Sequence, residues 1–342
     1  MKNNTLSNRP VLISGVYRSG TTFANAAISC FDGYSSLSSG LKFMRFCYGK
    51  YGHNIKSESQ LKSLLVDCQK RLDSRWGIQI IADEIFNQVV ETGLSYSTVY
   101  DMLVRDILGI RDQGLRHQWC DKLVLNWDLA EEFLDLFPSG VVVHLVRSPL
   151  DVLKSYQRMT SEPEPIYLDA IFNCYSSFIF AEKMEKKLNN RLIICKSQDL
   201  ADPHSGVYGK LSDLLDREFD RKKFNAGNFR TLIDEWDINS TRYKSISISR
   251  LRDSDNSSVT FTDLEIYLLE QICGDYMDMY SFPRDYKLKN LSQDEVENRL
   301  GFEYLIDRYN VASNGEDPGP SYFTDPISFE RKIINERQQK TK

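Results

Sequence analysis

The sequence predicts an α/β fold in which a parallel sheet is covered by helices on both faces. Three short runs rich in β-branched residues support this fold: VLIS (11–14), VVVHLV (141–146) and RLIIC (191–195). They lack polar–apolar alternation, as is typical of strands buried on both faces. The first run also leads into a glycine-bearing loop and a helical pattern, an arrangement that occurs where α/β proteins bind phosphate.

Helical patterns lie between and after these strands. Residues 58–72 place apolar side chains on one face, and residues 128–137 begin with a capping Asp128 and end before Pro138. A further helix is expected from about Tyr167 to Leu188. Thr262 and Glu265 form a capping box that opens another helix. Residues 253–258 are predicted to be an exposed loop.

Composition indicates one large globular domain spanning 1–342, because 41% of the side chains are apolar and 27% are charged. The 43 basic and 48 acidic residues give a formal charge of −5, which provides no general attraction to nucleic acid or to a membrane. The seven cysteines form no CxxC pair and are interpreted as reduced thiols, so we expect a cytoplasmic protein. No signal peptide or membrane span is apparent.

The first strand continues into GVYRSGTTF (15–23), which has the glycine spacing of a Walker A phosphate loop. The lysine expected after the second glycine is replaced by Thr21, so Arg18 must supply the cation. The alternative interpretation is an ordinary strand-to-helix turn.

A second candidate anion site follows the strand at 141–146. Arg147 stands at the end of that strand, and Ser148, Pro149 and Asp151 are typical of the start of a helix. Ser155 lies on the same helix, so a guanidinium and a hydroxyl are available to a second phosphate.

Together these segments resemble the sulfotransferases that use 3′-phosphoadenylyl sulfate (PAPS). GVYRSGTTF resembles their loop for the 5′-phosphosulfate, and VVVHLVRSPLDVLKSY resembles their motif for the 3′-phosphate. The segment from Trp119 to Lys122 is similar to the family's W-x-x-K segment, and IICKSQDL (193–200) is similar to its "YEDL" strand end, with Ser197 and Gln198 replacing the tyrosine and glutamate. The resemblance covers about residues 10–282, leaving 283–342 as a C-terminal extension.

This resemblance implies a role for each matching residue. Arg18 would stabilise the leaving oxygen, the loop residues Ser19, Gly20, Thr21 and Thr22 would hold the 5′-phosphate, and Lys122 would be a second cation near the sulfuryl group. Arg147 and Ser155 would bind the 3′-phosphate, with Arg252 or Arg250 as a late basic residue. No metal is required, and PAP is the product.

The general base is less clearly specified, because relatives use a histidine or glutamate that is absent here. We rank Asp121 and His117 first because they immediately precede Lys122. His53, Asp83 and Glu84 are the remaining candidates. His144, within a β-run, is predicted to be a core residue.

The expected function is sulfuryl transfer from PAPS to a hydroxyl, or less readily an amine, of a small metabolite or glycan. Two alternatives stay open at this point: a non-catalytic module that binds PAP or another nucleotide, and a P-loop kinase. The missing Walker lysine disfavours the kinase.

Overall fold

The computed structural model describes residues 9–37, 40–157, 165–225, 260–284 and 286–321. Its centre is a five-stranded sheet in the order β2-β3-β1-β4-β5, and every pairing is parallel. The strands are β1 (Val11–Gly15), β2 (Tyr34–Ser36), β3 (Gln118–Val124), β4 (Val141–Val146) and β5 (Leu192–Lys196). The predicted α/β fold is therefore confirmed.

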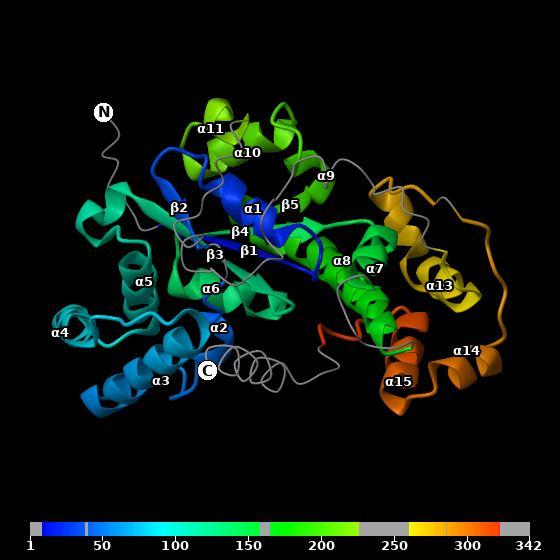
Figure 1. Ribbon diagram of the computed structural model, residues 1–342, viewed down its shortest axis with the longest axis horizontal. Helices are drawn as coiled ribbons and strands as arrows, with labels where there is room; N and C mark the ends of the chain where they lie inside the picture. Colours follow the sequence, from blue (N-terminus) through cyan, green and yellow to red (C-terminus); the bar gives the residue numbers. More distant parts are fainter. Residues whose placement is uncertain (1–8, 38–39, 158–164, 226–259, 285, 322–342) are drawn as a thin grey trace, which may run out of the picture.

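Helices surround the sheet, as Figure 1 shows. Before β3 the chain forms α1 (Thr21–Ile28), α2 (Phe43–Phe46), α3 (Glu58–Trp76), α4 (Ala82–Thr92), α5 (Tyr96–Ile107) and η1 (Arg111–Arg116). Between β3 and β5 it forms η2 (Trp127–Leu129), α6 (Ala130–Leu136), α7 (Pro149–Gln157), η3 (Ile166–Leu168), α8 (Asp169–Leu188) and η4 (Asn189–Arg191). After β5 come α9 (Ser197–Leu200), α10 (Gly206–Leu215), α11 (Arg221–Asn225), α13 (Asp263–Met279), α14 (Gln293–Leu300) and α15 (Glu303–Ser313).

The sheet has a hydrophobic core on each face, because successive side chains of a strand point to opposite sides. Ile13 and Val143 pack with α1 and α10 on one face. Leu12 and Val142 pack with α5, α6 and α8 on the other. Figure 1 shows α1 and α10 on one side of the strands and α6 and α8 on the other.

Most of the predicted helices are present, with one correction. The helix expected over 58–72 extends to Trp76, and the capping box of Thr262 and Glu265 opens α13. Asp128, however, does not cap α6: it lies inside the 3₁₀ turn η2, and α6 begins only at Ala130. The predicted loop at 253–258 lies outside the described residues.

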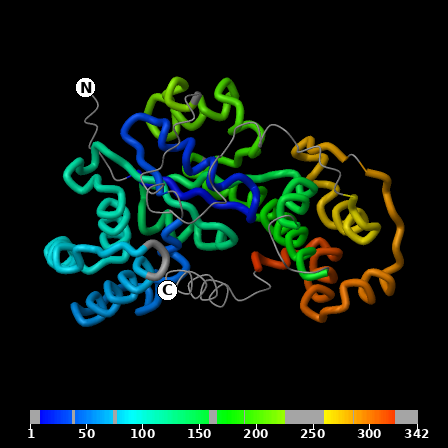
Figure 2. Tube along the Cα trace, in the orientation of Figure 1, coloured from blue at the N-terminus to red at the C-terminus, as the bar shows by residue number. Residues whose placement is uncertain are grey.

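The C-terminal helices pack against the domain through α8. Figure 2 shows α15 beside α8, and α13 lies along both α8 and α7. The Glu265 carboxylate of α13 is fully buried and accepts hydrogen bonds from the Tyr167 hydroxyl at 2.8 Å, from the Thr262 amide at 2.6 Å and from the Gln157 side chain. Since Gln157 is the last residue of α7, this acid fixes the end of that helix.

Within the described ranges, no helix has the length and apolar character needed to cross a bilayer.

Candidate active site

The predicted phosphate loop joins β1 to α1 in a tightly packed turn. Gly15 has φ 143°, and a Cβ there would lie 2.8 Å from the Leu145 carbonyl oxygen, so this position excludes a side chain. Ser19 donates to the Val16 carbonyl at 2.7 Å, and Ser197 donates to the Ser19 carbonyl. Gly20, with φ 92°, leads into α1, whose first amides have no partner within the helix and face the loop end. The turn therefore offers several N–H groups to an anion.

Arg18 connects this loop to the second predicted anion site. Its Nε donates to Ser155 Oγ at 2.8 Å, while Arg147 Nη1 donates to the Arg18 carbonyl oxygen at 2.6 Å. Arg18 also has a left-handed backbone, with φ 64°, which costs a non-glycine residue about 1–2 kcal/mol. Segments about 130 residues apart thus meet at one edge of the sheet, the carboxyl ends of β1 and β4.

Among the described residues, positive charge exceeds negative charge around Arg18 and Arg147 at this edge. Arg147 is largely buried, and the Asp151 carboxylate lies 3.9 Å from its Nε. Burial lowers the pKa of the Arg147 guanidinium, Asp151 opposes that shift, and the neighbouring Arg18 lowers the pKa further. Two adjacent guanidinium groups with one nearby carboxylate favour a bound anion.

Lys122 reaches the same edge from β3. It pairs in register with Ile13 of β1, and its Nζ donates to Thr22 Oγ1 at 2.6 Å on the first turn of α1. The chain at Gly40 packs directly on this part of β3, since a Cβ there would lie 2.2 Å from the Lys122 carbonyl oxygen. The structure therefore brings Lys122 onto the phosphate loop.

Asp121 is the first predicted site residue that the geometry contradicts. Because neighbouring residues of a strand point to opposite faces, its carboxylate lies across the sheet from the Lys122 side chain. Asp121 is fully buried and accepts hydrogen bonds from Tyr100 Oη at 2.6 Å, the Lys122 amide at 2.7 Å and the Leu41 amide at 3.0 Å. Burial raises the pKa of Asp121, and these hydrogen bonds oppose the shift. Its role is to hold the backbone of β3 and Leu41.

His117 is the second correction. It precedes the first residue of β3, so it lies at the amino-terminal edge of a sheet whose phosphate loop is at the carboxyl-terminal edge. Five strand residues at about 3.3 Å each place it roughly 16 Å from Lys122. Its Nε2 pairs with Ser35 Oγ at 2.8 Å, and burial, with help from Arg105, lowers the pKa of its ring.

The other candidate bases also lie away from the loop. His53 is exposed between α2 and α3, and Asp83 and Glu84 are exposed on the first turn of α4, where Glu84 pairs with Arg111 at 2.7 Å. His144 is fully buried, as predicted, and Arg250 and Arg252 lie outside the described residues.

The sequence analysis assigned no role in the site to several polar groups at the carboxyl ends of the strands. Ser197, just after β5, fastens the phosphate loop; the signal was its place directly after a buried strand. Within the described part of the chain, four buried polar atoms at or near these strand ends have no hydrogen-bond partner: Ser36 Oγ at the end of β2, Asn126 Oδ1 after β3, Ser148 Oγ after β4 and Gln198 Oε1 after β5. Buried polar atoms are normally satisfied, so this row fits an edge that holds a polar ligand.

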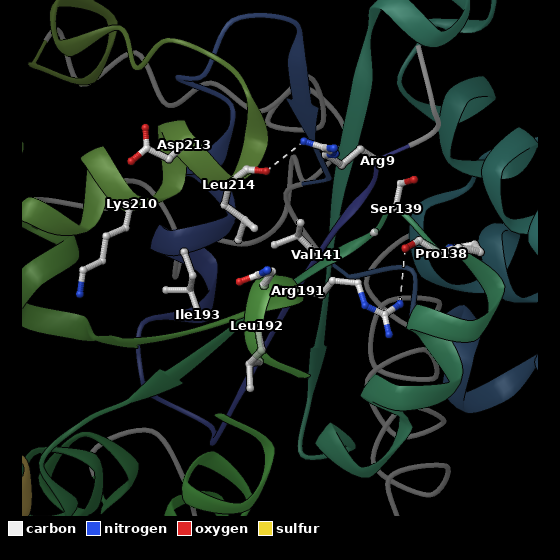
Figure 3. A pocket seen from close by; sticks show the side chains of 12 residues that line it. Arg9, Pro138, Ser139, Val141, Arg191, Leu192, Ile193, Lys210, Asp213 and Leu214 are labelled. Atoms are coloured by element: carbon white, nitrogen blue, oxygen red, sulfur yellow. Dashed lines mark hydrogen bonds between the residues drawn. The ribbon is translucent and has the colours of Figure 1, made fainter. Parts of the chain in front are cut away.

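A separate cavity of about 680 Å³ opens at the opposite edge of the sheet (Figure 3). Arg9 and Arg191 line it, and each is tied to backbone carbonyls: Arg9 to Leu214 at 3.0 Å, and Arg191 to Leu134 at 3.2 Å and to Pro138 at 3.4 Å. The length of the strands separates this cavity from the phosphate loop, so it is not part of the site.

Comparison with known proteins now identifies the class. A family model described as "Sulfotransferase family" matches residues 10–183, half of the chain, and the chain belongs to this family. No curated protein matches the chain. Among solved structures, the sulfotransferase domain of the Synechococcus PCC 7002 olefin synthase is 20% identical, with 83% of this chain and 98% of that domain covered and a TM-score of 0.52. The sulfotransferase domain of the curacin biosynthetic pathway is 18% identical over 86% of this chain and 98% of that domain, with a TM-score of 0.46.

Proposed function

We propose that this chain transfers a sulfuryl group from PAPS to a hydroxyl of a small metabolite or glycan and releases PAP. The observation that carries the proposal is the junction of two anion sites: Arg18 bonds Ser155, and Arg147 bonds the Arg18 carbonyl. PAPS carries phosphate at both its 5′ and 3′ positions, so it can occupy both halves at once. Seven buried free thiols fit a reducing compartment, and we place the protein in the cytoplasm.

In this proposal each side of the junction has one task. The loop from Ser19 to Thr22 binds the 5′-phosphate through backbone N–H groups and hydroxyls, and Arg147 with Ser155 binds the 3′-phosphate. Sulfuryl transfer leaves negative charge on the bridging oxygen. Arg18 and Lys122, both fixed beside the loop, stabilise that charge in the transition state.

A second candidate function, binding of PAP without catalysis, gains support from the positions of Asp121 and His117. Asp121 and His117 cannot act as bases beside Lys122, because one lies across the sheet and the other at its far edge. A protein that binds PAP without catalysing transfer would need neither. Binding and turnover must therefore be measured separately.

Calorimetry with PAP and with ATP tests the donor site. We expect micromolar or tighter PAP binding that is unchanged by EDTA and weakened by salt, and far weaker ATP binding because ATP has no 3′-phosphate. Ser155→Ala should weaken PAP binding. The control is Arg191→Ala, which changes a partly buried arginine at the opposite edge of the sheet and should leave PAP binding unchanged. Equal affinities for PAP and ATP would refute the assignment.

Transfer of labelled sulfate from PAPS to a panel of alcohols, sugars and amines then tests catalysis. Turnover with any of them supports the transferase. Tight PAP binding with no transfer to any acceptor class and no slow hydrolysis of PAPS supports the binding module.

A further inference from the structure

Two of the seven cysteines lie against each other. Cys47 follows α2, Cys68 lies within α3, and the Cys68 thiol points its hydrogen at Cys47 Sγ across 3.6 Å. Cys47 and Cys68 are both free thiols, and both side chains are buried. Gly49 and Lys50, two and three residues after Cys47, are nevertheless exposed. A small oxidant therefore needs only a local opening to reach Cys47.

The environment distinguishes this pair from the other thiols. The hydrogen bond from Cys68 lowers the pKa of Cys47; burial opposes this, and the nearby Arg71 guanidinium lowers the pKa further. Burial instead raises the pKa of Cys30 to about 11 and that of Cys195 to about 12. Since the thiolate is the reactive form, the lowered pKa favours Cys47 as the first sulfur to react, and Cys68, 3.6 Å away, is placed to resolve its oxidised form.

A chain of contacts leads from the pair to the predicted catalytic edge. Arg71, one turn beyond Cys68 on α3, donates from Nε to the Leu41 carbonyl at 2.8 Å. The Leu41 amide donates to Asp121 Oδ1 at 3.0 Å, and Asp121 adjoins Lys122 in β3. The Arg71 guanidinium also lies 4.0 Å from the centre of the Phe46 ring, next to Cys47.

We propose that Cys47 and Cys68 form a reversible disulfide when the protein meets hydrogen peroxide, and that this modification slows sulfuryl transfer. The Cys47 thiolate attacks peroxide and becomes a sulfenic acid as hydroxide leaves. The Cys68 sulfur then attacks Cys47 Sγ and water leaves. In sum, two thiols and one peroxide give one disulfide and two waters.

The new bond requires movement. A disulfide holds its sulfurs about 2.05 Å apart, so the pair must close by roughly 1.5 Å from the observed 3.6 Å. Helix α3 has 19 residues, whereas α2 is a single turn between Gly40 and Gly49. The shift therefore falls mainly on α2 and on Leu41, just before it. The effect on turnover rests on the proposed function; formation of the disulfide does not.

The experiment treats the full chain with stoichiometric peroxide and maps cysteine-containing peptides by mass spectrometry without reduction. We expect a Cys47–Cys68 cross-link that dithiothreitol reverses, in wild type and in the control Cys195→Ser, another buried thiol. Cys68→Ser should instead retain a sulfenic acid or more oxidised sulfur on Cys47. Should the serine variants fail to fold, Cys68→Ala serves the same purpose. Absence of the cross-link in folded wild-type protein overturns the proposal.

Hydrogen exchange at the Leu41 amide separates this inference from the proposed function. Oxidation should raise its exchange rate at least several-fold, with parallel loss of turnover, and Cys47→Ala should abolish both effects. A cross-linked protein with unchanged Leu41 exchange and unchanged turnover overturns the regulatory part. Reduced protein that shows no turnover at all counts against the transferase, while the cross-link and Leu41 exchange still decide the redox site.

Discussion

The imidazole of His144 makes the stability of this protein sensitive to acid. The ring is fully buried between β1, β4 and α8, with Nδ1 2.8 Å from Ser14 Oγ and Nε2 2.8 Å from Ser177 Oγ. Trp127 and Phe180 pack against it. Burial lowers the pKa of His144 from 6.5 to about 3, so the folded state keeps it neutral.

The sign and size of the effect follow from proton linkage. The unfolded chain binds a proton at His144 near pH 6.5, and the folded chain does not until about pH 3. The contribution of the neutral ring is therefore complete above pH 6.5 and is lost as the pH falls below it, at about 1.4 kcal/mol per pH unit. Between pH 6.5 and 4.5 this residue alone removes about 2–3 kcal/mol from the free energy of unfolding.

Urea unfolding followed by tryptophan fluorescence, at several pH values from 7.5 to 4.5, measures this loss. His144→Gln keeps a hydrogen-bonding amide but has no titrating ring, so its free energy of unfolding should fall less steeply with acid, by about 2–3 kcal/mol over that range. His204→Gln, which changes an exposed histidine after β5, should follow wild type. Parallel curves for wild type and His144→Gln would refute the reasoning.

Three further substitutions test the site. Arg147→Ala should weaken PAP binding by about 2–4 kcal/mol in calorimetry, because a phosphate loses its buried charged partner; an unchanged affinity would remove Arg147 from the donor site. Arg18→Ala and Lys122→Ala should lower turnover at saturating PAPS by on the order of 10²-fold or more, since their charges matter most in the transition state; a change in KM alone would make them binding residues. Asp121→Asn should reduce the free energy of unfolding by about 1–3 kcal/mol, because the Tyr100 hydroxyl loses its carboxylate acceptor, while the pH profile of the remaining turnover keeps its shape; a vanished acidic limb in that profile would restore Asp121 as the base.

The strands and helices with simple patterns could be predicted from the sequence. Uninterrupted apolar runs identified β1, β4 and β5, and glycine spacing identified the loop with Arg18. Strand β3, by contrast, reads QWCDKLV, and its mixture of charged and apolar residues gives no simple buried-strand pattern. Its assignment as a central strand depends on long-range pairing with β1 and β2, which local sequence does not encode.

The same strand explains why the base was misjudged. Proximity along the chain to Lys122 suggested Asp121 and His117, but a strand alternates its faces and spans the sheet from edge to edge. One residue of separation reverses the face, and five residues move a side chain most of the way to the opposite edge. Once β3 is known to be a strand, the alternation of its side chains between the two faces is enough to exclude Asp121 as a base beside Lys122.

The buried carboxylate of Glu265 limits how far the donor-binding half of this protein can be treated as a module. The family match ends at residue 183, yet the helix that carries Ser155 is held at its last residue by an acid from α13, and the phosphate loop is fastened by Ser197. A chain cut at 183, or a chimera that borrows residues 10–183, would inherit both phosphate-binding motifs without the contacts that keep them in place. Recombination between relatives therefore has to carry α9 and α13 along with the motifs. The part of the chain after the family match must be inherited together with the part that binds the donor.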